Sequence, residues 1–287
     1  MSLQIFCRLL AQYVAPQHAL SRFAGALARS ERPWLAQRLI DYFVSHYPIN
    51  LNEALEPELA HYASFNGLFT RRLSPDARPL ANALNAIVSP ADGQITEFGA
   101  LRGDQMIQAK GQYYSVDALL ANNPYAAQQF HDGTFATIYL APHNYHRVHA
   151  PCAGEVREID YVPGNLFSVN TETAARVPRL FTRNERVILH CTGAHGPFVV
   201  ILVGALLVGS IELADPVLNA EIASHRALRY ALPRTVSFAA GAELGHFNLG
   251  STVIVLFGRN AVQWAEHLAP GRAVRMGERL GAGAPVK

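Results

Sequence analysis

The spacing of apolar residues divides the chain into two parts. In the first part they recur every three or four residues, as on one face of a helix. Pro33 follows Ser30 and suits the first turn of such a helix. This pattern predicts a helical N-terminal module over residues 1–83. Its apolar positions include Leu3, Phe6, Leu9, Leu10 and Tyr13, then Leu20, Phe23, Ala24 and Leu27, then Trp34, Leu35, Leu39, Ile40 and Phe43.

From about residue 84 the pattern changes to short apolar runs separated by turn residues. Of the 21 glycines, 19 follow residue 84. Asp92-Gly93, Asp132-Gly133 and Pro163-Gly164 are typical turn dipeptides. We expect an α+β protein in which residues 84–287 form a mainly antiparallel β domain, as a sandwich or in a barrel-like form. The expected strands include residues 86–88, 135–140, 186–189 and 252–256, with two more within 198–211 and a short helix over 116–122.

Composition narrows the class of protein. Half of the residues are apolar, which is enough for a sizeable core, and 16% are charged. The 24 Lys and Arg residues against 22 Asp and Glu leave a formal charge of +2, too balanced for a nucleic-acid-binding protein. Residues 198–211 are too few to span a bilayer. Three cysteines without a C-x-x-C spacing indicate neither a disulfide framework nor a zinc ribbon.

Positive charge is concentrated near the N-terminus, where residues 1–50 hold five arginines against Glu31 and Asp41. A basic amphipathic segment of this kind can lie on an anionic membrane surface. The alternative is a helical hairpin that packs on its own core. Periodicity alone favours the hairpin, because apolar helical stripes usually face a core.

Three histidines within seven residues, His143, His146 and His149, form the densest cluster of titratable groups. Their spacing suggests a metal site at first sight. One helix, however, cannot present all three on one face, and a strand would turn His146 away from the other two. Arg147 within the cluster would also repel a cation. A metal site is therefore a weak hypothesis.

Two further segments are ordinary when taken alone. Asp92 before Gly93 is typical of a turn. Ser251, after Gly250, opens an apolar strand without a G-x-S-x-G elbow. Together with a histidine, however, these residues supply the carboxylate, base and hydroxyl that activate a serine nucleophile.

Seven motifs, in order along residues 65–270, resemble those of the phosphatidylserine decarboxylase proenzymes. Asn144 and Asn165 stand where that family leads us to expect acidic residues, and the segment from Leu213 to Pro216 lacks the aromatic residue after Ile-Glu. The departures remove no reactive group. The matching motifs are Phe69-Thr70-Arg71, Pro90-Ala91-Asp92-Gly93, Gln108-Ala109-Lys110-Gly111 with Tyr114-Ser115, Tyr145 to Pro151 (YHRVHAP), Tyr161 to Asn170 (YVPGNLFSVN), Asn184-Glu185-Arg186 and Leu249-Gly250-Ser251-Thr252.

The resemblance implies that the chain cleaves itself between Gly250 and Ser251. His149, oriented by Asp92, would take the proton of the Ser251 hydroxyl, which attacks the carbonyl of Gly250. The products would be chains 1–250 and 251–287, with Ser251 converted to a pyruvoyl group. A glycine before the serine leaves no Cβ to obstruct the attack.

The resemblance further implies conversion of phosphatidylserine to phosphatidylethanolamine and carbon dioxide, a step of phospholipid biosynthesis. The pyruvoyl ketone would bind the substrate amine as a Schiff base and act as the electron sink, with no metal. We expect His146 to be the general acid, and Ser168 and Tyr139 to contact the substrate. For Tyr139, core packing is an equal alternative.

A diacyl lipid has to enter the site from a bilayer. For residues 1–50 the resemblance therefore favours membrane docking over a helical hairpin that packs on its own core. We expect them to dock on the cytoplasmic face of the cell membrane as a peripheral module. The resemblance also suggests a homodimer. Three competing readings remain: a serine hydrolase that uses Ser251, His149 and Asp92; a metalloenzyme built on His143, His146 and His149; and a lipid-binding module without catalysis.

Overall fold

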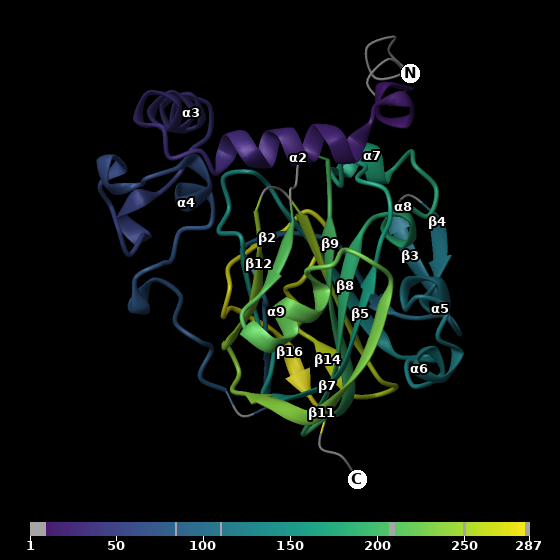
Figure 1. Cartoon of the computed structure of the whole chain (residues 1–287). Helices are drawn as coiled ribbons and strands as arrows, with labels where there is room; N and C mark the ends of the chain where they lie inside the picture. Colours follow the sequence, from purple (N-terminus) through teal and green to yellow (C-terminus); the bar gives the residue numbers. More distant parts are fainter. Residues whose placement is uncertain (1–9, 84, 110, 207–209, 249–250, 285–287) are drawn as a thin grey trace.

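A computed structural model describes residues 10–83, 85–109, 111–206, 210–248 and 251–284 (Figure 1). Gly250 and therefore the expected cleavage bond lie outside the described residues. Residues 10–14 are helical, and the other helices of the N-terminal part are α2 (Gln17–Ala28), α3 (Pro33–His46) and α4 (Phe65–Phe69). Among the described residues, no helix combines the length and apolar character needed to cross a bilayer.

The centre of the molecule is an eight-stranded antiparallel sheet in the order β11-β7-β8-β9-β13-β5-β2-β15. Its middle strands are rich in β-branched residues and buried on both faces. The expected strands over 135–140, 186–189 and 252–256 are confirmed as parts of this sheet. Its strands are β2 (Gly93–Ala100), β5 (Thr134–Leu140), β7 (Gly154–Val162), β8 (Arg186–Gly193), β9 (Gly196–Gly204), β11 (Leu228–Phe238), β13 (Ser251–Phe257) and β15 (Ala273–Val274).

Two three-stranded antiparallel sheets cover one face of the central sheet. They have the orders β1-β16-β14 and β10-β12-β6. Val253 and Val255 of β13 belong to the apolar core on this face, together with Val148 and Phe247 from the small sheets. The strands are β1 (Ala86–Val88), β6 (Arg147–His149), β10 (Ile211–Leu213), β12 (Glu243–Phe247), β14 (Val262–Trp264) and β16 (Arg279–Gly283), and α9 (Pro216–Ile222) packs beside them.

Short helices and a hairpin cover the opposite face, where Ile254 and Leu256 of β13 are buried. The expected helix over 116–122 is present as α5, although it ends at Leu119. These elements lie together on one flank of the sheet (Figure 1). They are β3 (Gln105–Ala109), β4 (Gln112–Ser115), α5 (Val116–Leu119), α6 (Pro124–Gln128), α7 (Thr171–Ala174) and α8 (Leu180–Arg183).

Helix α2 lies across the ends of the central strands (Figure 1). Its apolar residues Leu20 and Phe23 are exposed. The residues that it buries are Gln17, Ser21, Gly25 and Ala28, whereas Phe23 is 65% exposed. The expected helices through residues 20–27 and 34–43 are confirmed, whereas the predicted positions Leu3, Phe6 and Leu9 lie outside the described residues. The hairpin core is only partly present. Phe43 of α3 packs on Phe65 and Phe69 of α4 in a small apolar cluster, while Leu20 and Trp34 face outward.

The expected mixture of helices and mainly antiparallel strands is confirmed. The barrel-like alternative is wrong for the part of the chain that the structure describes, because the central sheet stays open and its outer strands β11 and β15 do not pair. Layers of other elements close its two faces instead. The division of the chain at residue 84 stays a prediction.

Candidate active site

Ser251 is the first residue of β13, in the middle of the central sheet. It is fully buried, and its backbone lies opposite Leu140 of β5 and Gly204 of β9. Paired residues share a face, so its side chain faces the same core as Leu140, Val253 and Val255. Its Oγ has no hydrogen-bond partner among the described residues. The hydroxyl of the neighbouring Thr252 is in the same state, so the family motif, and not the missing hydrogen bond, singles out Ser251.

His149 ends strand β6 in the small sheet that covers this same core. Its Nδ1 lies 2.8 Å from the carbonyl oxygen of Gly241, and its Nε2 lies 3.0 Å from the Tyr145 hydroxyl. A carbonyl oxygen can only accept, so Nδ1 carries the proton, and the unprotonated Nε2 accepts a hydrogen bond from the Tyr145 hydroxyl. Burial lowers the pKa of His149 below its ordinary value, although the carbonyl of Gly241 and the charges of Glu243 and Asp92 oppose this.

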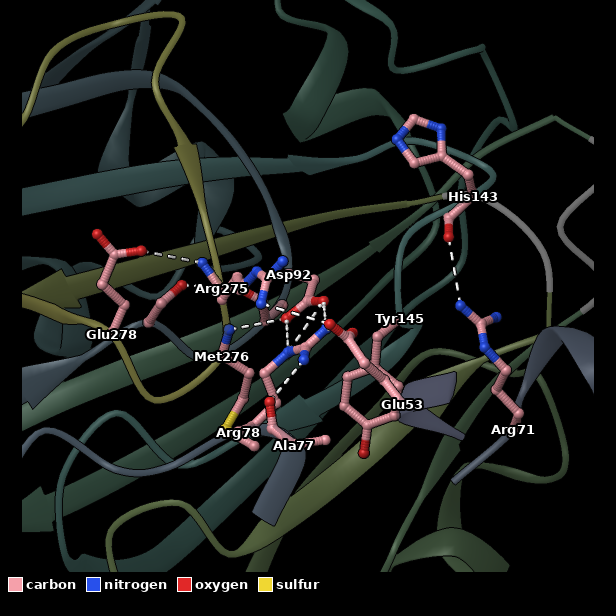
Figure 2. Close-up of polar contacts among 12 residues, drawn as sticks. Glu53, Arg71, Ala77, Arg78, Asp92, His143, Tyr145, Arg275, Met276 and Glu278 are labelled. Atoms are coloured by element: carbon pink, nitrogen blue, oxygen red, sulfur yellow. Dashed lines mark hydrogen bonds and ion pairs between the residues drawn. The ribbon is translucent and has the colours of Figure 1, made fainter. Parts of the chain in front are cut away.

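Asp92 lies in the turn before β2, where it is buried between Arg78 and the chain near β15 (Figure 2). Its carboxylate accepts hydrogen bonds from Arg78, including one of 2.6 Å from Nη2, and one of 2.8 Å from the backbone N–H of Met276. Burial by itself lowers the pKa of Arg78, but Asp92 and Glu53 outweigh it and raise this pKa above its ordinary value. Arg78 and the backbone N–H of Met276 therefore fix the position of the Asp92 side chain.

The expected direct orientation of His149 by Asp92 is not seen among the described residues. The two groups are linked more loosely. The backbone N–H of His149 donates to the carbonyl of Pro90 over 2.7 Å, which fixes strand β6 to the turn that carries Asp92. The relay itself stays a prediction.

A cavity of about 350 Å³ lies beside Asp92 and Tyr145. Its wall includes three arginines, Arg71, Arg78 and Arg275 (Figure 2). Glu53 bridges Arg78 at 2.7 Å and Arg275 at 3.4 Å, so much of this positive charge is neutralised. The cavity thus reaches the carboxylate of Asp92 and the tyrosine that bonds His149.

His146 is fully buried and stacks on Phe69, with ring centroids 4.0 Å apart. Its Nε2 lies 3.1 Å from the carbonyl of Ala141 and 3.3 Å from that of Pro142, and its Nδ1 has no partner among the described residues. Burial lowers the pKa of His146 to about 3. The ring is therefore neutral near pH 7, with its proton on Nε2.

The two residues expected to contact substrate, Tyr139 and Ser168, lie in different parts of the structure, and their contact with substrate stays a prediction. Tyr139 lies next to Leu140 in β5, so its side chain faces the opposite core, where it packs with the helical layer. The backbone N–H of Ser168 donates to Oε1 of Gln12 over 2.8 Å, and that of Leu166 to Oε1 of Gln17 over 2.6 Å. The N-terminal helices thus hold the loop that carries Ser168.

The three clustered histidines do not form a metal centre in the described parts of the chain, since His146 and His149 each face carbonyl oxygens instead. The structure does bring together Glu158, Asp160 and His190, whose ligand atoms lie within 4.8 Å of one another. Arg229 donates to Asp160 over 2.9 Å, so this cluster is an ion-pair network. No local motif indicates this cluster, because His190 lies on β8 and the two carboxylates lie on β7.

Several residues of the site are not predicted by the sequence motifs. Arg78 and Glu53 hold Asp92 but belong to none of the motifs. Tyr145 belongs to the histidine motif, and its spacing of four from His149 could have indicated the contact. The carbonyl of Gly241 left no signal, because any residue supplies one.

Comparison with known proteins decides the family. A family model described as phosphatidylserine decarboxylase matches residues 65–282, which is most of the chain and includes Asp92, His146, His149 and Ser251. The chain belongs to the phosphatidylserine decarboxylase family. A second model, described as PSD, matches residues 7–48.

Curated phosphatidylserine decarboxylase proenzymes are similar over nearly their whole length. The chain is 46% identical to that of Pseudomonas putida strain F1 over 277 residues, or 96% of each chain. It is 46% identical to that of Polaromonas naphthalenivorans over 277 residues, or 95% of each, and 44% identical to that of Saccharophagus degradans over 273 residues, or 94% of each. The expected family is thus confirmed, and with it a decarboxylase of phospholipid metabolism.

Proposed function

We propose that this member of the phosphatidylserine decarboxylase family converts phosphatidylserine to phosphatidylethanolamine and carbon dioxide by means of a pyruvoyl group that it makes from Ser251. The observation that carries the proposal is the place of the motif serine, Ser251, whose buried hydroxyl has no hydrogen-bond partner among the described residues at the start of the central strand β13. A hydroxyl without a competing hydrogen bond is available to attack the preceding carbonyl.

The first reaction is self-cleavage. His149 takes the hydroxyl proton of Ser251 on Nε2, once that nitrogen turns from Tyr145. The oxygen attacks the carbonyl carbon of Gly250, and the proton passes to the leaving amide nitrogen, so that the peptide becomes an ester. Loss of the Cα proton of Ser251 then breaks its Cβ–O bond. Gly250 leaves as a carboxylate, and water releases ammonia from the remaining dehydroalanine, which becomes pyruvoyl.

Asp92 supports this reaction through its charge. Its carboxylate favours the protonated form of His149 and so stabilises the imidazolium that forms when Ser251 is deprotonated. Arg78 and the N–H of Met276 keep that carboxylate in place. Asp92 thus acts on His149 across a short distance, without the direct hydrogen bond of a serine-protease triad.

In the second reaction the pyruvoyl group would supply the electron sink for the carbanion that decarboxylation leaves. His146 donates the proton to that carbon. Its buried ring is neutral in the free enzyme, but the negative charges of the substrate raise its pKa when they are brought alongside. Ser168 contacts the lipid headgroup, with its loop held by Gln12, whereas Tyr139 packs in the core on the other face of the central sheet.

The outward apolar side of α2 supports docking on an anionic membrane. Leu20 and Phe23 are exposed on this helix, as is Trp34 on α3, and Arg22 and Arg29 lie among them. Such a surface inserts apolar side chains between lipids while the arginines meet phosphates. We place this docking on the cytoplasmic face and expect the enzyme to work as a homodimer.

Vesicle sedimentation tests the docking. Replacing Arg22, Arg29 and Arg32 by Glu, or Phe23 by Ser, is expected to prevent binding to vesicles of anionic lipid. Tyr125→Ser is the matched control, because Tyr125 is 83% exposed but lies on α6, away from α2 (Figure 1). Unchanged binding of the Phe23 and arginine variants would contradict the docking.

The decarboxylation is tested by release of labelled carbon dioxide from carboxyl-labelled phosphatidylserine in detergent micelles. The wild-type protein is expected to release it, and Ser251→Ala to release none. An intact chain that instead reacts with acyl-type serine inhibitors would favour the hydrolase reading. Membrane binding without any release of carbon dioxide would favour a lipid-binding module.

A further inference from the structure

Asn248 is the last described residue before Ser251, and it is 2% exposed. Its side-chain Nδ2 donates to Oγ of Ser210 over 2.6 Å and to Oε1 of Glu212 over 2.7 Å. Its Oδ1 accepts from Nδ2 of Asn66 over 3.0 Å, and its backbone N–H donates to the carbonyl of Ser210 over 3.1 Å. These four hydrogen bonds fix both the side chain and the backbone of Asn248.

The partners come from two separate parts of the chain. Asn66 belongs to α4, Ser210 precedes β10 and Glu212 lies within it. Phe69, one turn after Asn66, stacks on His146, and the carbonyl of Thr70 accepts from Nε of Arg147 over 3.0 Å. Helix α4 and its exit therefore contact the histidine motif as well as Asn248.

The amide group of Asn248 is suited to this environment. Glu212 and Ser210 face it with acceptors, and a carboxylate can only accept, so both hydrogens of Nδ2 are used. Asn66 faces it with a donor, which uses Oδ1. An aspartate would satisfy Asn66 but would place a second carboxylate against Glu212 and lose both donors. An alanine would leave the polar groups of Asn66, Ser210 and Glu212 without this partner.

Two residues of chain separate Asn248 from Ser251. The reach of an extended chain limits Asn248 to about 7 Å from Gly250. On the other side, β13 fixes the backbone of Ser251 between β5 and β9. The described residues on either side of the expected cleavage bond are thus both fixed, Asn248 by its hydrogen bonds and Ser251 by the central sheet.

We propose that Asn248, with Asn66, Ser210 and Glu212, forms an upstream clamp that positions the carbonyl of Gly250 for attack by Ser251. Asn248 is a positioning residue for the self-cleavage, and it has no part in the later decarboxylation. This inference rests on the self-cleavage proposed above. An acyl shift requires the attacking oxygen and the carbonyl carbon to be aligned, and a displacement of about 1 Å costs roughly 100-fold in rate.

The test follows the fraction of cleaved chain with time after cell-free synthesis, by intact mass. Asn248→Asp is expected to slow cleavage about 100-fold. Glu212→Gln alone keeps an acceptor for Asn248 and is expected to cleave at nearly the wild-type rate. Adding Glu212→Gln to Asn248→Asp supplies an amide donor facing the new carboxylate, so the double variant is expected to recover most of the rate.

Asn219→Asp is the matched control. Asn219 lies in the neighbouring helix α9 and uses only its Oδ1, which accepts from the N–H of Leu213 over 2.9 Å. The same chemical change there removes no donor that the structure uses, and cleavage is expected to be unchanged. Each variant is also made in a Ser251→Ala background, where its thermal unfolding midpoint shows whether the uncleaved chain is folded.

The clamp is supported if Asn248→Asp is folded but slow and the double variant recovers. It is overturned if Asn248→Asp cleaves within about twofold of the wild-type rate, or if the double variant stays as slow as the single one. Slow cleavage that only accompanies unfolding, without recovery in the double variant, overturns it as well. A wild-type chain that never cleaves contradicts the proposed function instead.

Discussion

The buried His146 makes the stability of the protein depend on pH in a calculable way. Burial lowers its pKa to about 3, whereas the same group in an unfolded chain titrates near 6.5. Between these two values the unfolded chain binds a proton that the folded protein does not. The free energy of unfolding therefore falls as the pH is lowered through 6.5, and this contribution is complete only below about pH 3.

The size of the effect follows from the two pKa values. At pH 5 nearly every unfolded chain carries the proton on His146, and nearly every folded one does not. Between pH 7 and pH 5 this one residue removes about 2 kcal/mol from the free energy of unfolding, since each pKa unit corresponds to about 1.4 kcal/mol. That is a large fraction of the stability of an ordinary domain.

The variant His146→Gln isolates the contribution of His146 to the pH dependence of stability. A glutamine amide can still donate to the carbonyls of Ala141 and Pro142, but it does not titrate. Urea unfolding is measured at pH 7 and pH 5, in a Ser251→Ala background so that one intact chain unfolds. The variant is expected to lose about 2 kcal/mol less than its parent over this interval.

The comparison concerns the change with pH, so a constant cost of the substitution cancels. His267→Gln serves as the control, because His267 is exposed and is expected to leave the pH dependence unchanged. Parallel losses of stability in the His146 variant and its parent would refute the reasoning that burial keeps this ring neutral.

Two further predictions concern the surroundings of Asp92. Arg78→Met leaves the buried carboxylate of Asp92 without its cation, and it is expected to lower the free energy of unfolding by about 3 kcal/mol and to slow self-cleavage. The control is Arg272→Met, at an exposed ion pair with Glu278, which is expected to lower the free energy of unfolding by less than about 1 kcal/mol. Equal losses for the two variants in urea unfolding would contradict this. Gly93→Ala places a Cβ against the carbonyl oxygen of Tyr139, so β2 and β5 have to separate. We expect the free energy of unfolding to fall by about 2 kcal/mol or more, which is measured as a lower thermal unfolding midpoint. An unchanged midpoint would show that the backbone at Gly93 can shift without cost.

The sequence predicts the central strands well because their apolar runs are continuous. Residues 252–256 carry only apolar or β-branched side chains, and a strand buried on both faces requires such a run. The small strands β6, β10 and β12 left no comparable signal. Their three to five residues are too few to establish a period, and their pairing depends on segments far apart in the chain.

Helix α2 shows why periodicity alone does not predict which face of a helix is buried. The apolar stripe through Leu20 and Phe23 predicts a helix correctly, but it also suggests a face turned to the protein core. In the structure the opposite face is buried, because Gln17 bonds the N–H of Leu166 and Gly25 and Ala28 permit close approach. A single sequence does not distinguish a core from an external apolar phase such as a membrane.

The site residues were predicted by motif, whereas their partners were not. Asp92, His149 and Ser251 stand out as a carboxylate, a base and a hydroxyl in separate motifs. The groups that hold them are Arg78, the hydroxyl of Tyr145 and the carbonyl of Gly241. Such contacts depend on the folded backbone, so the expectation that Asp92 directly orients His149 could not have been checked before the fold was known.

The most direct test of the central claim is the intact mass of the purified wild-type protein under denaturing conditions. Self-cleavage predicts two chains, residues 1–250 and 251–287, with the shorter one lacking a free amino terminus and gaining mass on reduction with borohydride. The Ser251→Ala chain is predicted to remain whole. A single, unmodified wild-type chain after prolonged incubation would contradict the account.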